Sequence, residues 1–239
     1  MKQHVCPWWF AYSFDNPVRR LLHPPEKLLA PWVRSGMTVL DVGCGIGHFS
    51  LGMARMVGPG GRVIAADLQE RALKVVARRA RRAGLADRVT THRCGPEACG
   101  VAGPVDFALA FWMLHETPSV EGFCREIAGT LSPGGRFLVA EPAFHVSGDA
   151  FEGELAAAAR AGLKLVERPR VRFSRAALFG RAISREMPTV IAGPGTGPPS
   201  HAARLGEPRE ASLAPRQPCR SRSGSASRRR AASGCSCRC

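Results

Sequence analysis

The sequence predicts an α/β fold with a seven-stranded sheet that is mostly parallel and has an antiparallel last strand. Three observations support this prediction. From Met37 onward, short apolar runs alternate with helical patterns, as in parallel βαβ units. The first apolar run leads directly into closely spaced glycines. The last two runs are separated only by Pro169 and its neighbours, too few residues for a parallel crossover, so the last strand should be antiparallel to the one before it.

The elements follow in order from this pattern. Two short helices are expected at 18–22 and 26–32, before the sheet. Helices should then begin near Gly47, Gln69, Val120 and Asp149, and the interval 94–103 is too short and too rich in glycine for more than a turn or a brief helix. The expected strands are 38–42, 62–67, 88–92, 105–111, 136–141, 163–168 and 171–178.

The chain divides into three expected regions. Residues 1–36 form a helical cap with an aromatic cluster that either covers the core or acts as a lid over a substrate. Residues 37–187 form the α/β domain. Residues 188–239 are expected to be a disordered basic tail, because they contain 7 Pro, 6 Gly and 8 Ser but only four Val, Ile, Leu or Phe residues. The cap's aromatic residues are Trp8, Trp9, Phe10, Tyr12 and Phe14.

The formal net charge of +15 is unevenly distributed. The 52 residues from 188 to 239 hold 9 Arg and 2 Glu, and so carry nearly half of the excess. The tail cysteines Cys235, Cys237 and Cys239 lack the spacing of a folded zinc site, so no metal is expected. The arginines at 78, 79, 81 and 82 either form the solvated face of a helix or a patch for an anionic partner.

No apolar run approaches the roughly 20 residues of a membrane span, so an integral membrane protein is not expected. Residues 1–10 include Pro7 and lack the apolar stretch of a secretory signal, which favours a cytoplasmic location. The nine cysteines are accordingly expected to be free thiols. Cys6, Cys94, Cys99 and Cys124 can form a thiol site for a soft acceptor such as arsenite, although nothing in their spacing requires one.

A glycine loop and a distant acid predict a nucleoside site. Gly43, Gly45 and Gly47 follow the first strand and allow the backbone to turn sharply and to approach a ligand closely. Asp67 ends the second strand, where a carboxylate can accept hydrogen bonds from both ribose hydroxyls. The spacing is G-x-G-x-G preceded by Asp41, whereas a pyrophosphate loop has G-x-G-x-x-G.

With these residues the sequence resembles the class I S-adenosylmethionine-dependent methyltransferases. The matching pieces are DVGCGIG at 41–47, AAD at 65–67, VDFALAF at 105–111 and LSPGGRFLVAE at 131–141. The resemblance covers about 37–180 and implies a Rossmann-like, doubly wound sheet and S-adenosyl-L-methionine as the cofactor. A dinucleotide oxidoreductase is the less favoured enzyme class.

The resemblance also implies roles for individual residues. Gly43, Gly45 and Gly47 would border the methionine part of the cofactor, Asp41 would serve the loop or the cofactor's ammonium group, and Asp67 would hold the ribose. Phe111, at the end of the fourth strand, would line the same site. Many relatives bind adenine through an acid after the third strand. This chain has CGPE at 94–97 there, so adenine would be held by backbone groups or by Glu97.

The carboxyl ends of the later strands supply the candidate catalytic residues. His115 is the preferred base, followed by Glu141, Glu116 and His145, because imidazole titrates near neutrality. A base is needed only if the acceptor must lose a proton. Alternatively, His115 only closes a loop and Glu141 only caps the helix near Asp149.

The residues after the fourth strand favour a small, partly apolar acceptor. Nucleic-acid amino methyltransferases of this class carry an Asn/Asp-Pro-Pro-aromatic motif there, and this chain has WMLH at 112–115. Trp112, Phe144 and the N-terminal aromatic residues would line the acceptor site. Two alternatives are an RNA-associated protein that uses the basic tail and a catalytically silent partner with the same fold. The oligomeric state cannot be predicted from the sequence.

Overall fold

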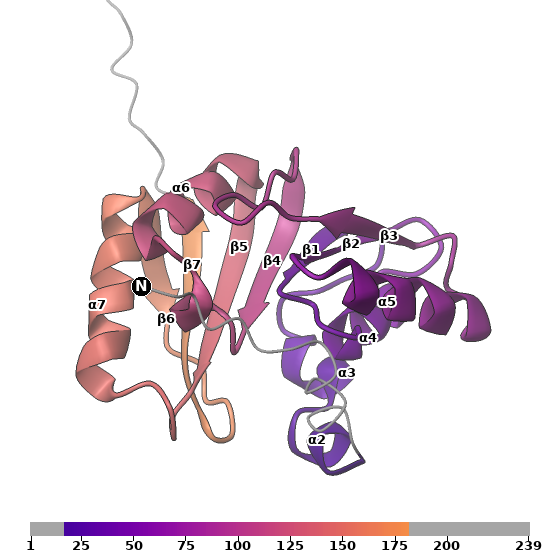
Figure 1. Cartoon of the computed structure of the whole chain (residues 1–239), viewed down its shortest axis with the longest axis horizontal. Coiled ribbons are helices and arrows are strands. Elements are labelled where there is room, and N and C mark those ends of the chain that lie inside the picture. The colour runs from indigo at the N-terminus through magenta and orange to yellow at the C-terminus, as the bar shows by residue number, and fades with distance from the viewer. Residues whose placement is uncertain (1–16, 182–239) are drawn as a thin grey trace, which may run out of the picture. The chain divides into compact units, whose positions relative to one another are not determined.

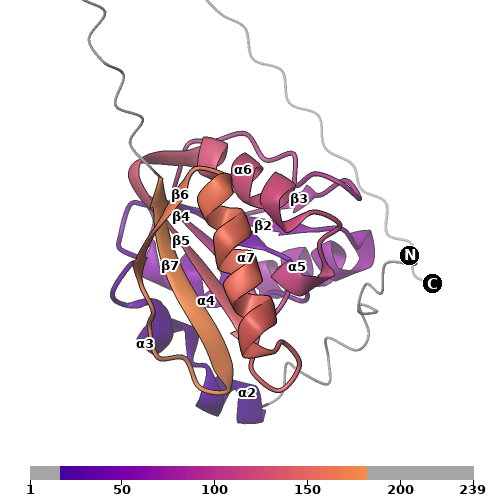
Figure 2. The same ribbon diagram turned by 90° about the vertical axis from the view of Figure 1, so that its left-hand side faces the viewer.

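The computed structural model describes residues 17–181. The expected aromatic cluster at 8–14 and the expected tail at 188–239 lie outside this range. Within it, seven strands form one sheet in the order β3-β2-β1-β4-β5-β7-β6, and helices cover both faces (Figures 1 and 2). No helix in the described range is long and apolar enough to cross a membrane.

The strands of the sheet agree closely with the predicted ones. Parallel pairing joins β1 to β2 and β4, β2 to β3, and β4 to β5, whereas β7 is antiparallel to both β5 and β6. The predicted antiparallel last strand is therefore confirmed, and it lies between β5 and β6. The strands are β1 (Thr38–Val42), β2 (Arg62–Asp67), β3 (Val89–Arg93), β4 (Val105–Phe111), β5 (Leu131–Pro142), β6 (Leu163–Glu167) and β7 (Ser174–Arg181).

Four strands depart from their predicted limits: β3 and β6 by one residue, and β5 and β7 by more. β5 begins at Leu131, five residues before its predicted start at residue 136. The reason is that Leu131 already pairs with Val105 of β4. The register then shifts, and pairing resumes between Phe107 and Arg136. β7 begins three residues later than expected. Val171 forms only an isolated bridge with Ser174, so the turn between the last two strands is longer than predicted. No helix forms between 94 and 103.

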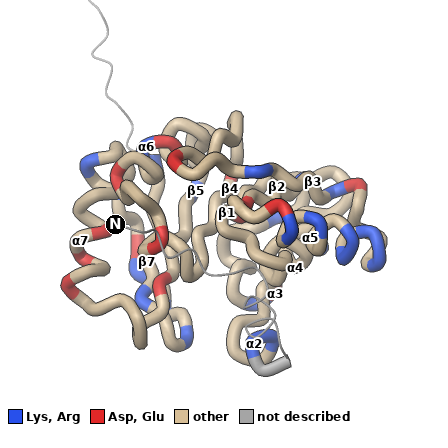
Figure 3. Tube along the Cα trace, in the orientation of Figure 1, with Lys and Arg blue, Asp and Glu red and all other residues tan. Residues whose placement is uncertain are grey.

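The helices begin close to their predicted positions. The helix after β2 starts at Glu70, has a buried face that includes Leu73 and Val76, and is followed by Gly84 at φ +67°. Several of its basic residues lie in the last turn, at the C-terminal end of the helix (Figure 3). The helices are α2 (Pro17–Leu22), α3 (Pro25–Leu29), α4 (His48–Met56), α5 (Glu70–Arg82), α6 (Val120–Thr130) and α7 (Gly148–Arg160), with a short 3-10 helix, η1 (Leu114–Glu116).

The core has one apolar layer on each face of the sheet. Residues of β1 alternate between the layers: Val39 packs with residues of α3 and α4, and Leu40 packs with residues of α6 and α7. This alternation follows from the two-residue period of a strand. Leu29 of α3 and Val33 belong to the same layer as Val39, so part of the expected N-terminal cap contributes directly to the domain core.

Side-chain caps fix the starts of the two helices on the β5 side of the sheet. The hydroxyl of Ser119 accepts a hydrogen bond from the Gly122 N–H at 3.0 Å, and that of Ser147 accepts one from the Ala150 N–H at 3.1 Å. Each cap satisfies a donor that the helix leaves unpaired in its first turn. Ser147, and not Glu141, therefore caps α7.

We expect Ser119→Ala to lower the free energy of unfolding by about 1 kcal/mol, because the first turn of α6 loses its side-chain acceptor. Ser119→Asp is the matched control, since a carboxylate keeps the acceptor and interacts favourably with the helix dipole. Urea denaturation of the three proteins measures the difference. Equal destabilisation by Ala and Asp would show that the cap does not stabilise the helix.

Candidate active site

The sheet topology places a cavity at the carboxyl ends of the central strands. Strand order changes direction between β1 and β4, and ligands bind at such switch points in open α/β sheets. The register pairs Val42 with both Ala66 and Ala110, so Gly43, Asp67 and Phe111 follow at the same edge. A cavity of about 430 Å³ opens there, within the usual size range of small-ligand pockets.

The glycine loop forms one wall of this cavity. Gly43, Gly45 and Gly47 have φ values of +65°, +52° and +88°, a backbone region that residues with a Cβ atom rarely adopt. A Cβ on Gly43 would lie 2.8 Å from Cγ of Met113, and a Cβ on Gly47 would lie 3.1 Å from Cγ2 of Val76. Gly43 and Gly45 line the cavity, whereas Gly47 starts α4 and packs against α5.

The Asp67 carboxylate ties the glycine loop to the end of β2. Its Oδ2 accepts a hydrogen bond from the Gly45 N–H at 2.9 Å, and its Oδ1 accepts one from the Gln69 N–H at 2.8 Å. Burial raises the pKa of Asp67, and the two backbone hydrogen bonds oppose this effect. Each carboxylate oxygen has a second lone pair, so Asp67 can still accept hydrogen bonds from a ligand.

Two further contacts hold the loop and the start of α4. The Ser50 hydroxyl donates to Oδ2 of the buried Asp41, which joins α4 to the end of β1. Burial raises the pKa of Asp41 to about 6, although the Ser50 hydrogen bond lowers it. The guanidinium of Arg79 donates to the Ile46 carbonyl oxygen at 2.7 Å. One arginine of the basic run on α5 therefore supports the loop.

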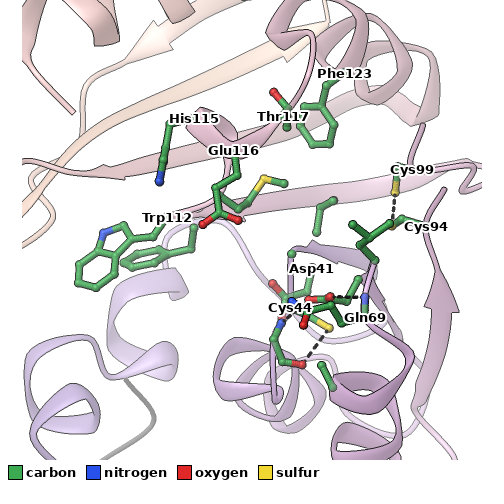
Figure 4. Close-up of a pocket in the computed structure, with 18 of the residues that line it drawn as sticks. Asp41, Cys44, Gln69, Cys94, Cys99, Trp112, His115, Glu116, Thr117 and Phe123 are labelled. Atoms are coloured by element: carbon green, nitrogen blue, oxygen red, sulfur yellow. Dashed lines mark hydrogen bonds between the residues drawn. The ribbon is translucent and has the colours of Figure 1, made fainter. Parts of the chain in front are cut away.

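An aromatic cluster forms the opposite side of the cavity. The ring centroids of Phe49 and Phe111 lie 4.4 Å apart, and those of Trp112 and Phe144 lie 5.6 Å apart in an edge-on arrangement. The guanidinium of Arg19, from α2, lies 5.1 Å from the Trp112 ring centroid. Figure 4 shows Trp112 on the same side of the cavity as His115 and Glu116. This end can hold a flat, partly apolar molecule.

Trp112 has an unusual backbone conformation. Its φ of 60° is uncommon for a residue with a large side chain, and it is held by two hydrogen bonds. The backbone N–H donates to the Ala140 carbonyl oxygen at 2.7 Å, and the indole N–H donates to the Ser174 hydroxyl at 2.8 Å. Strained residues of this kind cluster at functional sites. Residues of β5 and β7 thus fix the orientation of the Trp112 side chain.

His115 and Glu141 form a hydrogen-bonded pair beside this wall. Nδ1 of His115 bonds Oε2 of Glu141, whose side chain is fully buried. The other oxygen of Glu141 accepts from the N–H groups of Leu114 at 2.9 Å and Met113 at 3.2 Å. Burial lowers the pKa of His115, but the hydrogen bond and charge of Glu141, together with other nearby carboxylates, outweigh this effect and raise the pKa. With Nδ1 engaged, Nε2 is the nitrogen left to act on a ligand.

The structure brings most of the predicted site residues together. Of the eight residues predicted with most weight as catalytic or cofactor-binding, six line the cavity; Gly47 does not, and Glu141 lies behind His115. Glu116, His145, Phe144 and Glu97 also line it. The six residues are Asp41, Gly43, Gly45, Asp67, Phe111 and His115. Within residues 17–181, no group of three or more His, Cys, Asp or Glu side chains is arranged to hold a metal ion.

Sequence reasoning missed several residues that build the site. Arg19 reaches the cavity from α2, and nothing distinguishes it in the sequence from other surface arginines. Met113 packs where a Cβ on Gly43 would lie. Its position in the segment after the fourth strand does not predict this contact. Ser50 was also missed, although its position on the helix after the glycine loop is a usable signal for a contact with Asp41.

Comparisons with known proteins show which proteins this chain is similar to. A family model described as a methyltransferase domain matches residues 33–178. A ubiquinone/menaquinone biosynthesis C-methyltransferase from Pasteurella multocida is 33% identical over 110 residues, which are 46% of this chain and 41% of that protein. A ubiquinone biosynthesis O-methyltransferase from Xanthomonas axonopodis is 31% identical over 134 residues, 55% of this chain and 54% of that protein. The chain thus matches about half of the length of these curated relatives.

A solved structure has the same fold. A SAM-dependent methyltransferase from Aquifex aeolicus superposes with a TM-score of 0.66 at 24% sequence identity, covering 73% of this chain and 98% of that one. The fold is that of a Rossmann-like α/β domain with a glycine loop at the carboxyl edge of its sheet. The match over residues 33–178 places the chain more narrowly: it belongs to the methyltransferase domain family. The predicted family, fold class and cofactor class are therefore confirmed.

We expect Gly43→Ala to destabilise the protein more than Gly36→Ala does. Both glycines have positive φ, at +65° and +85°, so both substitutions strain the backbone. Only at Gly43 does the new Cβ meet a side chain, Met113, at 2.8 Å, whereas nothing lies within 4 Å of a Cβ on Gly36. The difference between the two free energies of unfolding isolates the steric conflict, and we expect it to be about 1–3 kcal/mol. Equal losses would show that Met113 yields freely.

Proposed function

We propose that this protein transfers a methyl group from S-adenosylmethionine to a small, partly apolar acceptor with a ring of the phenol or quinone type. The observation that carries the proposal is the set of residues that line the cavity described above. Its glycine-loop end offers a carboxylate and closely approaching backbone, and its other end offers aromatic rings and an imidazole. The curated relatives named for quinone biosynthesis support this class of acceptor.

The residues at the glycine-loop end fit the cofactor. Asp67 is 7% exposed at the cavity edge, where its carboxylate can accept hydrogen bonds from ribose hydroxyls. Any side chain at Gly43 would crowd this wall, so the bare backbone leaves room for a ligand. Residues 94–99 supply the wall for the adenine ring. When bound, S-adenosylmethionine supplies an electrophilic methyl group on a positively charged sulfur.

The aromatic end positions the acceptor. A methyl transfer of this kind is an in-line displacement, so alignment of the acceptor contributes more than acid chemistry. Trp112 and Phe111 offer flat surfaces for a ring, and Arg19 offers a positive charge beside them. A ring that carries an ionised oxygen matches this combination of surfaces. Phe144 is 72% exposed at the cavity mouth, so bound acceptor would cover part of an otherwise exposed aromatic side chain.

His115 acts as the base when the acceptor must lose a proton. Its Nδ1–H donates to the Glu141 carboxylate, so Nε2 carries the lone pair that takes the proton. Glu141 is a positioning residue, because it holds the imidazole and stabilises the imidazolium but is fully buried away from the cavity. The N–H groups of Met113 and Leu114 fix the carboxylate in turn.

We expect Asp67→Ala to weaken S-adenosylmethionine binding by about 1–3 kcal/mol, because the ribose loses its acceptor. Calorimetric titration of the full chain measures this change, with Asp87→Ala as a control at an exposed aspartate outside the cavity. Thermal melting of both variants shows whether the fold is retained. An unchanged dissociation constant in folded Asp67→Ala protein would remove Asp67 from the cofactor site. Binding of NAD and not of S-adenosylmethionine by the unmodified chain would overturn the proposed function.

The pH dependence of turnover tests the role of His115. Its raised pKa means that the neutral, proton-accepting form gains population as pH rises through a value above 6.5, so the rate should rise over that range. Glu141→Gln removes the charge that raises this pKa, and the rise in rate should move to lower pH. Transfer of labelled methyl to phenol and quinone acceptors provides the measurement.

We expect His115→Gln to lower kcat by about 10²–10⁴-fold, which is the usual contribution of a general base. His145→Gln is the matched control, because the rings of His115 and His145 lie 4.9 Å apart and both line the cavity. A greater loss in His145→Gln would assign the base to His145. Equal rates in both variants and the unmodified protein would show that the acceptor needs no base.

A further inference from the structure

Two thiols meet in the wall of the cofactor cavity. The Cys94 Sγ–H donates to Sγ of Cys99, with the two sulfurs 3.6 Å apart, and both residues line the cavity. Figure 4 shows this contact on the side of the cavity that carries Asp41, Cys44 and Gln69. The residues between them, 95–98, are exposed and also line the cavity. The pair therefore closes the base of the loop that we assign to the adenine ring.

The backbone fixes both ends of this loop. Cys94 N–H donates to the Asp67 carbonyl oxygen at 3.0 Å, which joins the first thiol to the end of β2. Cys99 N–H donates to the Glu126 carboxylate of α6 at 2.8 Å, and its carbonyl oxygen bonds the His92 ring at 2.8 Å. The two sulfurs are thus held near each other before any bond forms, and closure of so short a loop costs little chain entropy.

The two other cysteines of the described range have no such partner. Cys44 and Cys124 are buried, and burial raises the pKa of both thiols, to about 12 for Cys124. At Cys99 the direction is opposite: the hydrogen bond from Cys94 stabilises the thiolate and lowers its pKa. Cys99 is also buried, but it lines the cavity and accepts the hydrogen bond from the half-buried Cys94, so it is assigned as the nucleophile of the pair. Cys94, the donor, is the resolving thiol.

We propose that Cys94 and Cys99 are a redox-active dithiol, which a peroxide converts reversibly to a disulfide that weakens cofactor binding. The Cys99 thiolate attacks one oxygen of hydrogen peroxide; the O–O bond breaks, hydroxide leaves, and Cys99 becomes a sulfenic acid. The Cys94 sulfur then attacks the Cys99 sulfur. The S–O bond breaks, and the departing hydroxide takes the Cys94 proton to form water. Two thiols are oxidised and one peroxide is reduced.

The effect on the cofactor follows from the required movement and rests on the proposed function. A disulfide brings its sulfurs to about 2.05 Å, so at least one of the two cysteine side chains must move from the observed separation of 3.6 Å. Cys99 is held by two contacts to neighbouring elements, whereas Cys94 is joined directly to the backbone of Asp67. A shift at Cys94 therefore disturbs both the adenine wall and the residue proposed to hold the ribose.

Peptide mapping of the full chain tests the formation of the bond. The chain is treated with hydrogen peroxide, its remaining thiols are blocked, and it is cut after glutamate, which separates Cys94 from Cys99 at Glu97 and both from Cys124 at Glu116 and Glu121. The expected product is the 71–97 peptide linked through Cys94 to Cys99 of the 98–116 peptide, lighter by two hydrogen atoms than the two free peptides together and separable by dithiothreitol. Failure of this link to form, with Cys94 and Cys99 both blocked as free thiols, overturns the proposal.

Calorimetric titration with S-adenosylmethionine then tests the consequence. Oxidation should weaken binding by at least about threefold, and dithiothreitol should restore it. Cys94→Ala and Cys99→Ala should remove the response to peroxide, while Cys124→Ala, a matched control outside the cavity, should keep it. Cys94 is only half-buried, and thermal melting of the Cys94→Ala variant shows whether the fold is retained. A disulfide that leaves the affinity unchanged overturns the proposed regulation, whereas a reduced chain that binds no S-adenosylmethionine contradicts the proposed function.

Discussion

The hydrogen bond between the Gly45 N–H and the Asp67 carboxylate is the contact on which the site depends. It holds the loop after β1 against the end of β2. Because Asp67 also accepts from Gln69, one carboxylate fixes the glycine loop and the start of α5 together. The loop follows this path with a left-handed backbone at Gly43. Because Gly43 has no Cβ atom, it also leaves room for the Met113 side chain. The end of β1 and the segment after β4 are therefore in close contact at the cavity wall.

A second set of contacts builds the catalytic end outward from the core. Glu141 is buried at the end of β5 and accepts from two backbone N–H groups that follow β4. Its remaining oxygen holds His115. A buried carboxylate with these donors needs no water to satisfy it, and its charge favours a protonated imidazole. The proposed base must be neutral to accept a proton, and the Glu141 charge opposes this neutral form of His115. The action of His115 is therefore expected to depend on pH.

The cavity wall between these two ends contains a pair of thiols that the proposed methyl transfer does not use. Cys94 and Cys99 lie in a loop fixed to β2, β3 and α6, so any bond between them is transmitted to residues around the cavity. The proposed dithiol would connect the proposed methyl transfer with the oxidation state of its surroundings. This connection comes from the position of the loop in the fold, because the same two thiols on a free surface loop would change no binding site.

The sequence alone determined the succession of strands and helices along the chain, the glycine loop, the acid at the end of β2 and the family. Each of these depends on local spacing and periodicity. It placed β1, β2 and β4 at their observed limits. It could not predict the start of β7, where the chain pairs through an isolated bridge, or the start of β5, which follows a register shift against β4. Only the tertiary structure joined His115 to Glu141, Arg19 to Trp112 and Cys94 to Cys99, because side chains from different elements meet through packing and strand register, which local sequence patterns do not encode.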